Sequence, residues 1–105
     1  MKKINSILEF EKIVSQNKRT IWYFYSNICI DCISIKNEIH RLDEEFKDYN
    51  IISIERSEFL DLFKTLNVFG IPSIIIFENN KIIKKWIDKY PKSVDEIIDF
   101  IKGGN

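Results

Sequence analysis

The sequence predicts an α/β fold in which helices flank both faces of a central mixed sheet. Apolar, β-branched segments alternate with amphipathic segments of helical spacing along most of the chain. The segment 20–25 is apolar and aromatic without polar alternation, which is typical of a strand covered on both faces. Asn79-Asn80 suits a tight hairpin turn between two apolar segments, because Asn tolerates positive φ. We expect four strands, with a fifth if Lys3-Ile4 also pairs, in a single domain of residues 1–105.

The N-terminal segment should form a helix that leads into the first central strand. Ser6 and Glu9 have the spacing of a capping box, so the helix should begin after Ser6 and end near Gln16. Residues 17–19 should turn the chain, and Thr20–Tyr25 should then form the strand. Its aromatic side chains are therefore expected in the core rather than in a binding surface.

A long helix is expected over Cys29–Asp48, followed by a strand over Ile51–Ile54. Apolar residues recur along the helix every three or four positions, as expected for a buried face. This stripe consists of Cys32, Ile35, Ile39, Leu42 and Phe46.

The remaining elements are a short helix, a strand hairpin and a final helix. Ser57 is expected to cap the short helix, which carries Phe59, Leu60 and Phe63. The two strands of the hairpin are expected over Ser73–Phe77 and Lys81–Ile87, and Lys84 and Lys85 indicate that the second one lies at an edge of the sheet. The capping box of Ser93 and Glu96 should begin the last helix. Strands joined through helices should pair in parallel, and the hairpin should add an antiparallel edge.

Composition excludes several classes of function. The chain has 105 residues, 45% of them hydrophobic, and its 16 basic and 16 acidic residues cancel. We therefore expect a folded domain with neither a nucleic-acid-binding face nor a membrane segment, which would need about 20 apolar residues in a row. The two cysteines are separated by only two residues, so a disulfide between them would add little to the stability of the fold. A chemical role and a cytoplasmic location follow as expectations.

Cys29 and Cys32 are the candidate catalytic residues. Cys29 follows the buried strand and opens a helix, where unpaired N–H groups favour a thiolate, and Cys32 lies one turn deeper. The pair suits thiol–disulfide exchange, in which Cys29 attacks a substrate disulfide and Cys32 then releases the reduced product. Asp31 is a candidate modulating residue because its like charge opposes thiolate formation at Cys29, and a second role as acceptor of the Cys32 proton is open.

Ile28 and Ile30 flank Cys29 in a turn that should be exposed, where packing does not require apolar residues. We therefore expect them to contribute to a substrate-docking surface. His40 is the one histidine and lies off the apolar stripe, so a solvated side chain is favoured over a general base.

The strand Ile21–Tyr25, the Cys29-Ile30-Asp31-Cys32 motif and Gly70-Ile71-Pro72-Ser73 together resemble the thioredoxin family. The resemblance covers almost the whole chain and implies a thioredoxin-like fold and protein-disulfide reductase activity. It also implies that Pro72 is cis and faces the cysteine pair, and that the Ile71 backbone pairs with a bound peptide. Ile71 and Pro72 therefore join the candidate substrate-binding residues.

The chain departs from the thioredoxin pattern around this motif. Ile28 replaces the family's usual tryptophan, and Ile30-Asp31 replaces its Gly-Pro. Tyr23 stands where the family has a buried acid that helps to move the second thiol's proton, and Ser53 stands where it has a neighbouring lysine. Asp88 aligns near the glycine that flattens the family's docking surface.

The expected partners are disulfide-containing protein substrates, and the resemblance implies a flavoprotein similar to thioredoxin reductase that would supply electrons from NADPH. We expect a monomer with no bound cofactor or metal, and with no nucleic-acid or membrane partner. Two alternatives stay open. The chain could be a redox-inert thioredoxin-like adaptor, or Cys29 and Cys32 could each contribute to a zinc site shared between two chains.

Overall fold

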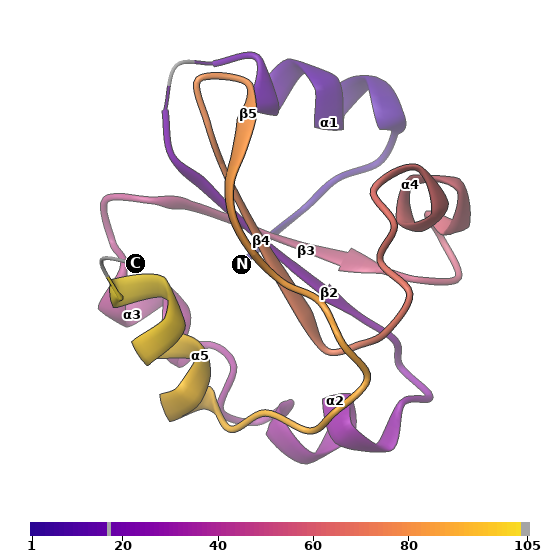
Figure 1. Cartoon of the computed structure of the whole chain (residues 1–105), viewed down its shortest axis with the longest axis vertical. Coiled ribbons are helices and arrows are strands. Elements are labelled where there is room, and N and C mark those ends of the chain that lie inside the picture. Colours follow the sequence, from indigo (N-terminus) through magenta and orange to yellow (C-terminus); the bar gives the residue numbers. More distant parts are fainter. Residues whose placement is uncertain (17, 104–105) are drawn as a thin grey trace.

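The computed structural model describes residues 1–16 and 18–103 of the chain, in which helices cover both faces of a five-stranded sheet (Figure 1). The strands are β1 (Lys2–Lys3), β2 (Thr20–Tyr25), β3 (Asn50–Glu55), β4 (Ser73–Glu78) and β5 (Lys81–Trp86). The helices are α1 (Ile7–Val14), α2 (Ile30–Ile35), α3 (Arg41–Glu45), α4 (Leu60–Thr65) and α5 (Val94–Lys102). The α/β class and the mixed sheet are as predicted, and β1 supplies the fifth strand. Asn17 of the expected turn and residues 104–105 of the expected domain lie outside the described residues.

The sheet order is β1-β3-β2-β4-β5, which places β2 at the centre and β5 at an edge. Two buried clusters cover its two faces. One joins α1 and α4 to side chains such as Trp22 and Phe24, and the other joins α2, α3 and α5 to Ile21 and Tyr23. Alternate residues of β2 thus face opposite layers, and both layers are apolar. This explains why the strand lacks polar alternation, and it confirms that its first four aromatic and apolar residues belong to the core.

The expectation that all strands joined through helices are parallel is wrong for β4. β2 pairs with β3 in parallel, but β4 pairs with β2 antiparallel, with Ser73 opposite Phe24. A parallel connection must carry the chain back along the whole strand, which takes about a dozen residues or more. Residues 56–72 are numerous enough for such a return, but their helix α4 has only six residues and spans about 9 Å, against about 20 Å for a six-residue strand, and the chain re-enters the sheet at the carboxyl end of β2 in the opposite direction.

The expected long helix is wrong as a continuous element, because it is divided into α2 and α3. Between them, Glu38 N–H donates to Ile35 O at 3.0 Å and Arg41 N–H donates to Glu38 O at 3.0 Å, which are tighter turns than those of an α-helix. The apolar stripe survives this break. Cys32, Ile35, Leu42 and Phe46 are buried, and Ile39 packs against the same cluster.

Local turn and cap chemistry agrees with the sequence in most places. Ser93 and Glu96 form the expected reciprocal capping box, and Asn79 and Asn80 adopt φ values of 55° and 62° in the hairpin turn. At α1, Ser6 accepts from the Glu9 N–H, as predicted, but the Glu9 carboxylate accepts from the Asn5 N–H at 2.8 Å instead of that of Ser6.

The cap predicted at Ser57 is wrong. Phe59 precedes α4 and gives no side-chain cap, because Ser57 is engaged with the Glu55 carboxylate. Of the expected edge lysines, Lys85 is exposed, whereas Lys84 Nζ donates to the Phe100 and Gly103 carbonyl oxygens at the end of α5.

Candidate active site

The two cysteines lie where the central strand β2 gives way to α2. Cys29 is the N-cap residue of α2, and its Sγ accepts a hydrogen bond from the Cys32 backbone N–H at 3.3 Å. Cys29 is half-buried, whereas Cys32 is only 3% exposed, and neither is in a disulfide. The structure therefore brings the predicted pair together with one sulfur accessible and the other shielded.

Cys32 differs chemically from an ordinary thiol. Burial raises its pKa to about 12, and a hydrogen bond with Cys29 adds to that rise. Hydrogen bonds from the Ser26 backbone and the Tyr23 side chain act in the opposite direction. In the absence of substrate Cys32 is thus held as a neutral thiol at ordinary pH.

The loop before β4 faces this pair. Cys29 Sγ lies 4.0 Å from the Ile71 carbonyl oxygen, and the Ile71–Pro72 peptide bond is cis. Ile71 is half-buried, and Pro72 is buried. Ser73 Oγ donates to the Gly70 carbonyl oxygen at 2.6 Å, which fixes the start of the loop.

Exposed apolar side chains flank Cys29 in the sequence and precede the loop that faces it. Ile28 and Ile30 are 89% and 81% exposed, as expected for residues without a packing role. Phe69, in the loop before Gly70, is 78% exposed. Sequence reasoning missed Phe69, although an aromatic residue directly before the Gly-Ile-Pro break is a usable signal.

Asp31 and His40 are the two polar side chains near the motif that the sequence singled out besides the cysteines. Asp31 is half-buried in the first turn of α2, and its backbone carbonyl accepts from the Ser34 hydroxyl at 2.8 Å. His40 is exposed, with its Nε2 3.8 Å from the Glu44 carboxylate. His40 is therefore placed as a surface residue, in agreement with the sequence.

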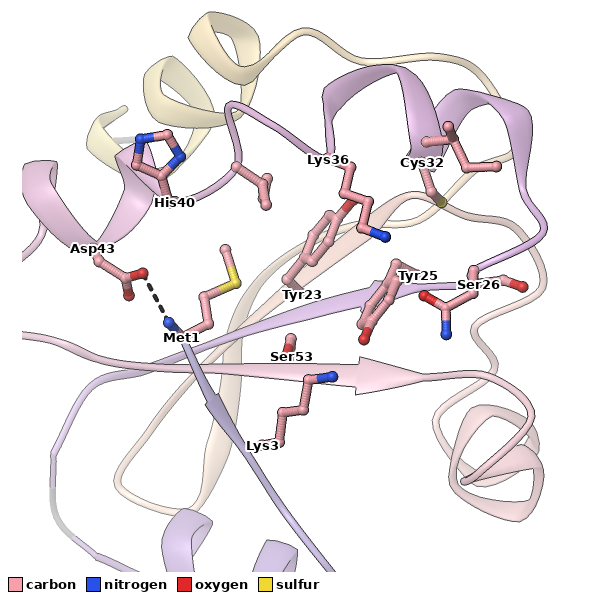
Figure 2. A pocket seen from close by; sticks show the side chains of 13 residues that line it. Met1, Lys3, Tyr23, Tyr25, Ser26, Cys32, Lys36, His40, Asp43 and Ser53 are labelled. Atoms are coloured by element: carbon pink, nitrogen blue, oxygen red, sulfur yellow. Dashed lines mark hydrogen bonds and ion pairs between the residues drawn. The ribbon is translucent and has the colours of Figure 1, made fainter.

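A cavity of about 520 Å³ opens on the inner side of Cys32 (Figure 2). Tyr23 stands on β2 and reaches toward α2, and the Cys32 sulfur points down toward the sheet from the opposite wall. The Tyr23 ring is stacked on Tyr25, with centroids 5.5 Å apart, and it is only 4% exposed. Ser53 lies beside Tyr23 on β3 and also lines the cavity.

Glu55 is a buried acid that sequence reasoning did not single out. Its carboxylate accepts from the Asn27 N–H at 3.3 Å and from the Ser57 N–H at 3.0 Å. Burial alone would raise its pKa, but these bonds and the Ser57 hydroxyl hold the pKa of Glu55 below its ordinary value. Glu55 therefore ties the end of β3 to the loop that carries Cys29. An acid directly after the apolar strand Ile51–Ile54 was the available signal.

A second polar cluster supports the loop that holds Pro72. The Lys92 side chain has no exposed surface, and its Nζ lies 2.6 Å from Asp88 Oδ1 and 3.0 Å from the Tyr90 carbonyl oxygen. Trp86 Nε1 donates to Asp88 Oδ2 at 3.0 Å. A Cβ on Gly70 would lie only 2.5 Å from the Asp88 carbonyl carbon, so the two loops are in direct contact.

Within residues 1–16 and 18–103, no group of three or more His, Cys, Asp or Glu side chains is arranged to hold a metal ion. In the same part of the chain, no helix is long and apolar enough to cross a bilayer.

An accessible thiol where the central strand gives way to a helix, with a second thiol one turn deeper, is an arrangement suited to a thiol–disulfide oxidoreductase. The family model "Thioredoxin" matches residues 2–103. The chain therefore belongs to the thioredoxin family, which confirms the resemblance.

Similar proteins span nearly the same length. Thioredoxin of Mycoplasma genitalium is 29% identical over 96 residues, covering 91% of this chain and 92% of that protein. Thioredoxin-1 of Saccharomyces cerevisiae is 23% identical over 90 residues, covering 86% of this chain and 87% of that protein.

Solved structures agree in fold. Oxidised thioredoxin from Plasmodium falciparum superposes with a TM-score of 0.78 at 18% identity, over 98% of this chain and 99% of that one. Thioredoxin from Trypanosoma brucei brucei gives a TM-score of 0.80 at 20% identity, over 96% and 90% of the two chains. The thioredoxin-like fold is thereby confirmed, and thiol–disulfide oxidoreductase is the general activity that family and fold support.

Proposed function

We propose that this protein is a protein-disulfide reductase that works through a cycle between the dithiol and disulfide forms of Cys29 and Cys32. The observation that carries the proposal is the division of the pair into an accessible sulfur and a buried one. The accessible Cys29 Sγ accepts a hydrogen bond from the Cys32 N–H, an interaction that favours negative charge on that sulfur.

The cycle consists of two exchange steps. The Cys29 thiolate attacks one sulfur of the substrate disulfide, forms a mixed disulfide and releases the other substrate sulfur as a thiolate. Cys32 then loses its proton and attacks Cys29 Sγ, which breaks the mixed disulfide and releases the second substrate thiolate. Two electrons pass to the substrate, and the protein is left with a Cys29–Cys32 disulfide. A flavoprotein similar to thioredoxin reductase is the proposed donor that restores the dithiol, and the cytosol is the proposed compartment.

Insulin disulfide reduction in the presence of dithiothreitol tests the cycle with three proteins. The wild type should turn over, and Cys29→Ser and Cys32→Ser should both lose turnover. Only Cys32→Ser should accumulate a mixed disulfide with the substrate, detected by mass spectrometry. Activity that survives Cys29→Ser would overturn the proposal, and an inactive but folded wild type would favour a binding module instead.

The proposed docking surface consists of Ile28, Ile30, Ile71 and Pro72. Ile28 and Ile30 offer apolar area beside the reacting sulfur, and the Ile71 backbone is available to pair with an extended substrate segment. We expect Ile28→Ser to raise the KM for a protein disulfide several-fold while leaving the rate with a small disulfide unchanged. Ile83→Ser on β5 is the matched control, because Ile83 is also exposed, at 47%. Equal effects of the two substitutions would remove Ile28 from the surface.

Asp31 is proposed to modulate Cys29 through its negative charge. Asp31→Asn removes the charge and keeps the shape, so the thiolate fraction of Cys29 at neutral pH should rise. The rate of alkylation by iodoacetamide measures that fraction in the Cys32→Ser background. An unchanged rate in Asp31→Asn would show that the charge does not act on Cys29.

A further inference from the structure

The release step of the proposed function requires Cys32 to give up a proton from a buried position. Cys32 is 3% exposed on the protein surface, but the cavity reaches its inner side. Lys3 and Lys36 line the cavity and are exposed, so this space is continuous with solvent. A proton that leaves Cys32 therefore has a route to water that does not pass the substrate bound at Cys29.

The cavity offers this proton no nearby free carboxylate. Among the described residues that line it, one carries a carboxylate, Asp43. Asp43 is paired with the Met1 amino group at 2.8 Å, at the far end of the cavity from Cys32 (Figure 2). Asp31 does not line the cavity, which separates it from the inner side of Cys32.

Tyr23 is the polar side chain that reaches Cys32 from the sheet. Its ring is held by stacking on Tyr25 and by burial, and it lines the same cavity as Cys32, whose sulfur points toward the sheet from the opposite wall. Burial, together with the charges that Cys32 and Cys29 can carry, raises the pKa of Tyr23 above its ordinary value. The hydroxyl therefore stays protonated throughout the working range, and it can donate a hydrogen bond but cannot take up the proton.

We propose that Tyr23 is a catalytic residue of the release step, in which its hydroxyl donates a hydrogen bond to the Cys32 sulfur as negative charge develops there. The proton of Cys32 passes to water through the cavity, and the resulting thiolate attacks Cys29 Sγ. The Cys29–Cys32 bond forms as the mixed disulfide breaks, and the leaving sulfur takes the electron pair. This inference rests on the proposed reductase cycle and assigns its second step.

The charged and titratable groups around the cavity bear on how this step varies with pH. Besides Tyr23 and Cys32, they are the Met1 amino group, Lys3, Tyr25, Cys29, Lys36, His40 and Asp43. The two lysines favour an anion at Cys32, and Asp43 is neutralised by its ion pair. Because Tyr23 cannot act as the base, the rate of release should rise steadily with pH, without a break due to Tyr23.

A small aromatic disulfide, dithiobis(nitrobenzoate), separates the two steps in one stopped-flow trace. Attack by Cys29 releases one coloured thionitrobenzoate, and release by Cys32 gives the second. Tyr23→Phe should slow the second phase about tenfold or more, the usual value of a hydrogen bond to a charged group, and leave the first phase within about twofold. Tyr25→Phe is the matched control, since it removes the same hydroxyl from the stacked neighbour, and neither phase should change.

Tyr23→Asp places a carboxylate at position 23. Its effect on the pH dependence of the second phase would not be expected if residue 23 only packed in the core. In Tyr23→Asp the log of the second rate, followed from about pH 6 to about pH 9, should acquire a break where the carboxyl titrates. An unchanged second phase in Tyr23→Phe overturns the role of Tyr23, whereas a break in folded Tyr23→Asp would support it, by showing that a group at position 23 acts on the Cys32 sulfur. If wild type releases only one equivalent, the reductase cycle itself fails, which is a distinct outcome.

Discussion

Replacement of Asp88 by Asn is expected to destabilise the protein strongly, because it leaves a buried ammonium group without its counter-charge. The Lys92 side chain has no exposed surface and lies 2.6 Å from Asp88, while the Asp88 side chain keeps 31% of its surface exposed. Lys92 Nζ also lies 4.9 Å from the centroid of the Trp86 ring. The remaining contacts, to Trp86 and to the Tyr90 carbonyl, cannot neutralise the charge.

The magnitude follows from how buried this pair is. Removal of one partner of a fully buried ion pair costs about 3–5 kcal/mol. Because Asp88 is partly exposed, water can compensate some of the loss, and we expect about 2–3 kcal/mol for Asp88→Asn. In a domain of this size, that loss corresponds to a fall in Tm of roughly 8–20 °C.

Urea denaturation of four proteins tests this prediction. The set is wild type, Asp88→Asn, Lys92→Met and the double variant, and the coupling free energy comes from the double-mutant cycle. The double variant should recover most of the loss, since an apolar side chain at 92 needs no partner. If Asp88→Asn costs less than about 0.5 kcal/mol, or the double variant is as unstable as the single ones combined, the pairing argument is refuted.

Three further predictions concern the neighbourhood of the cysteines. Gly70→Ala should cost about 1–3 kcal/mol in urea denaturation because its Cβ would lie 2.5 Å from backbone, and Gly103→Ala, with its nearest contact at 3.1 Å, is the control with the smaller expected loss. Glu55 has a lowered pKa when folded, so its contribution to stability should be present above its unfolded pKa of about 4.3 and lost as pH falls through the folded pKa. Glu55→Gln should therefore lower stability at pH 7 by about 1–3 kcal/mol and flatten the acid limb of stability against pH; an unchanged limb would contradict this. Cys32 has a pKa raised to about 12, so the reduced protein should hold its stability up to about pH 8.5 and lose it as pH rises toward 12, and an identical alkaline limb in Cys32→Ser would refute the assignment.

Local chemistry in the sequence predicted the elements better than their connections. The β2 bounds were predicted correctly because its apolar run ends in a polar segment on both sides, and the hairpin was predicted from the positive-φ tendency of Asn79 and Asn80. The interruption between α2 and α3 could not be predicted in this way. The buried stripe keeps its spacing across the break, so the pattern of apolar residues is the same for one helix or two. The antiparallel direction of β4 depends on the length of α4, which the sequence left uncertain.

Some residues of the candidate site could likewise be predicted from the sequence, and others could not. The cysteines and the Pro72 loop carry compact motifs, so their proximity could be predicted. Tyr23 was recognised as a departure from the family pattern, but its place opposite Cys32 in the cavity depends on the pairing of β2 with its neighbours and on the position of α2. Lys92 gave no signal, because a lysine looks the same in sequence whether it is solvated or fully buried.

The break after α2 has a consequence for how the redox segment moves. α3 and α5 share one buried cluster that includes Leu42 and Ile97, and exposed ion pairs join Arg41 to Asp95 at 2.7 Å and Lys102 to Glu45 at 3.1 Å. α2 is connected to α3 by tight turns and not by a continuous helix. We therefore expect α2 to open locally at a lower free energy than α3 and α5, with loss of the packing of Cys32 and Ile35 as its main cost. Hydrogen–deuterium exchange should then be faster at the amides of α2 than at those of α5.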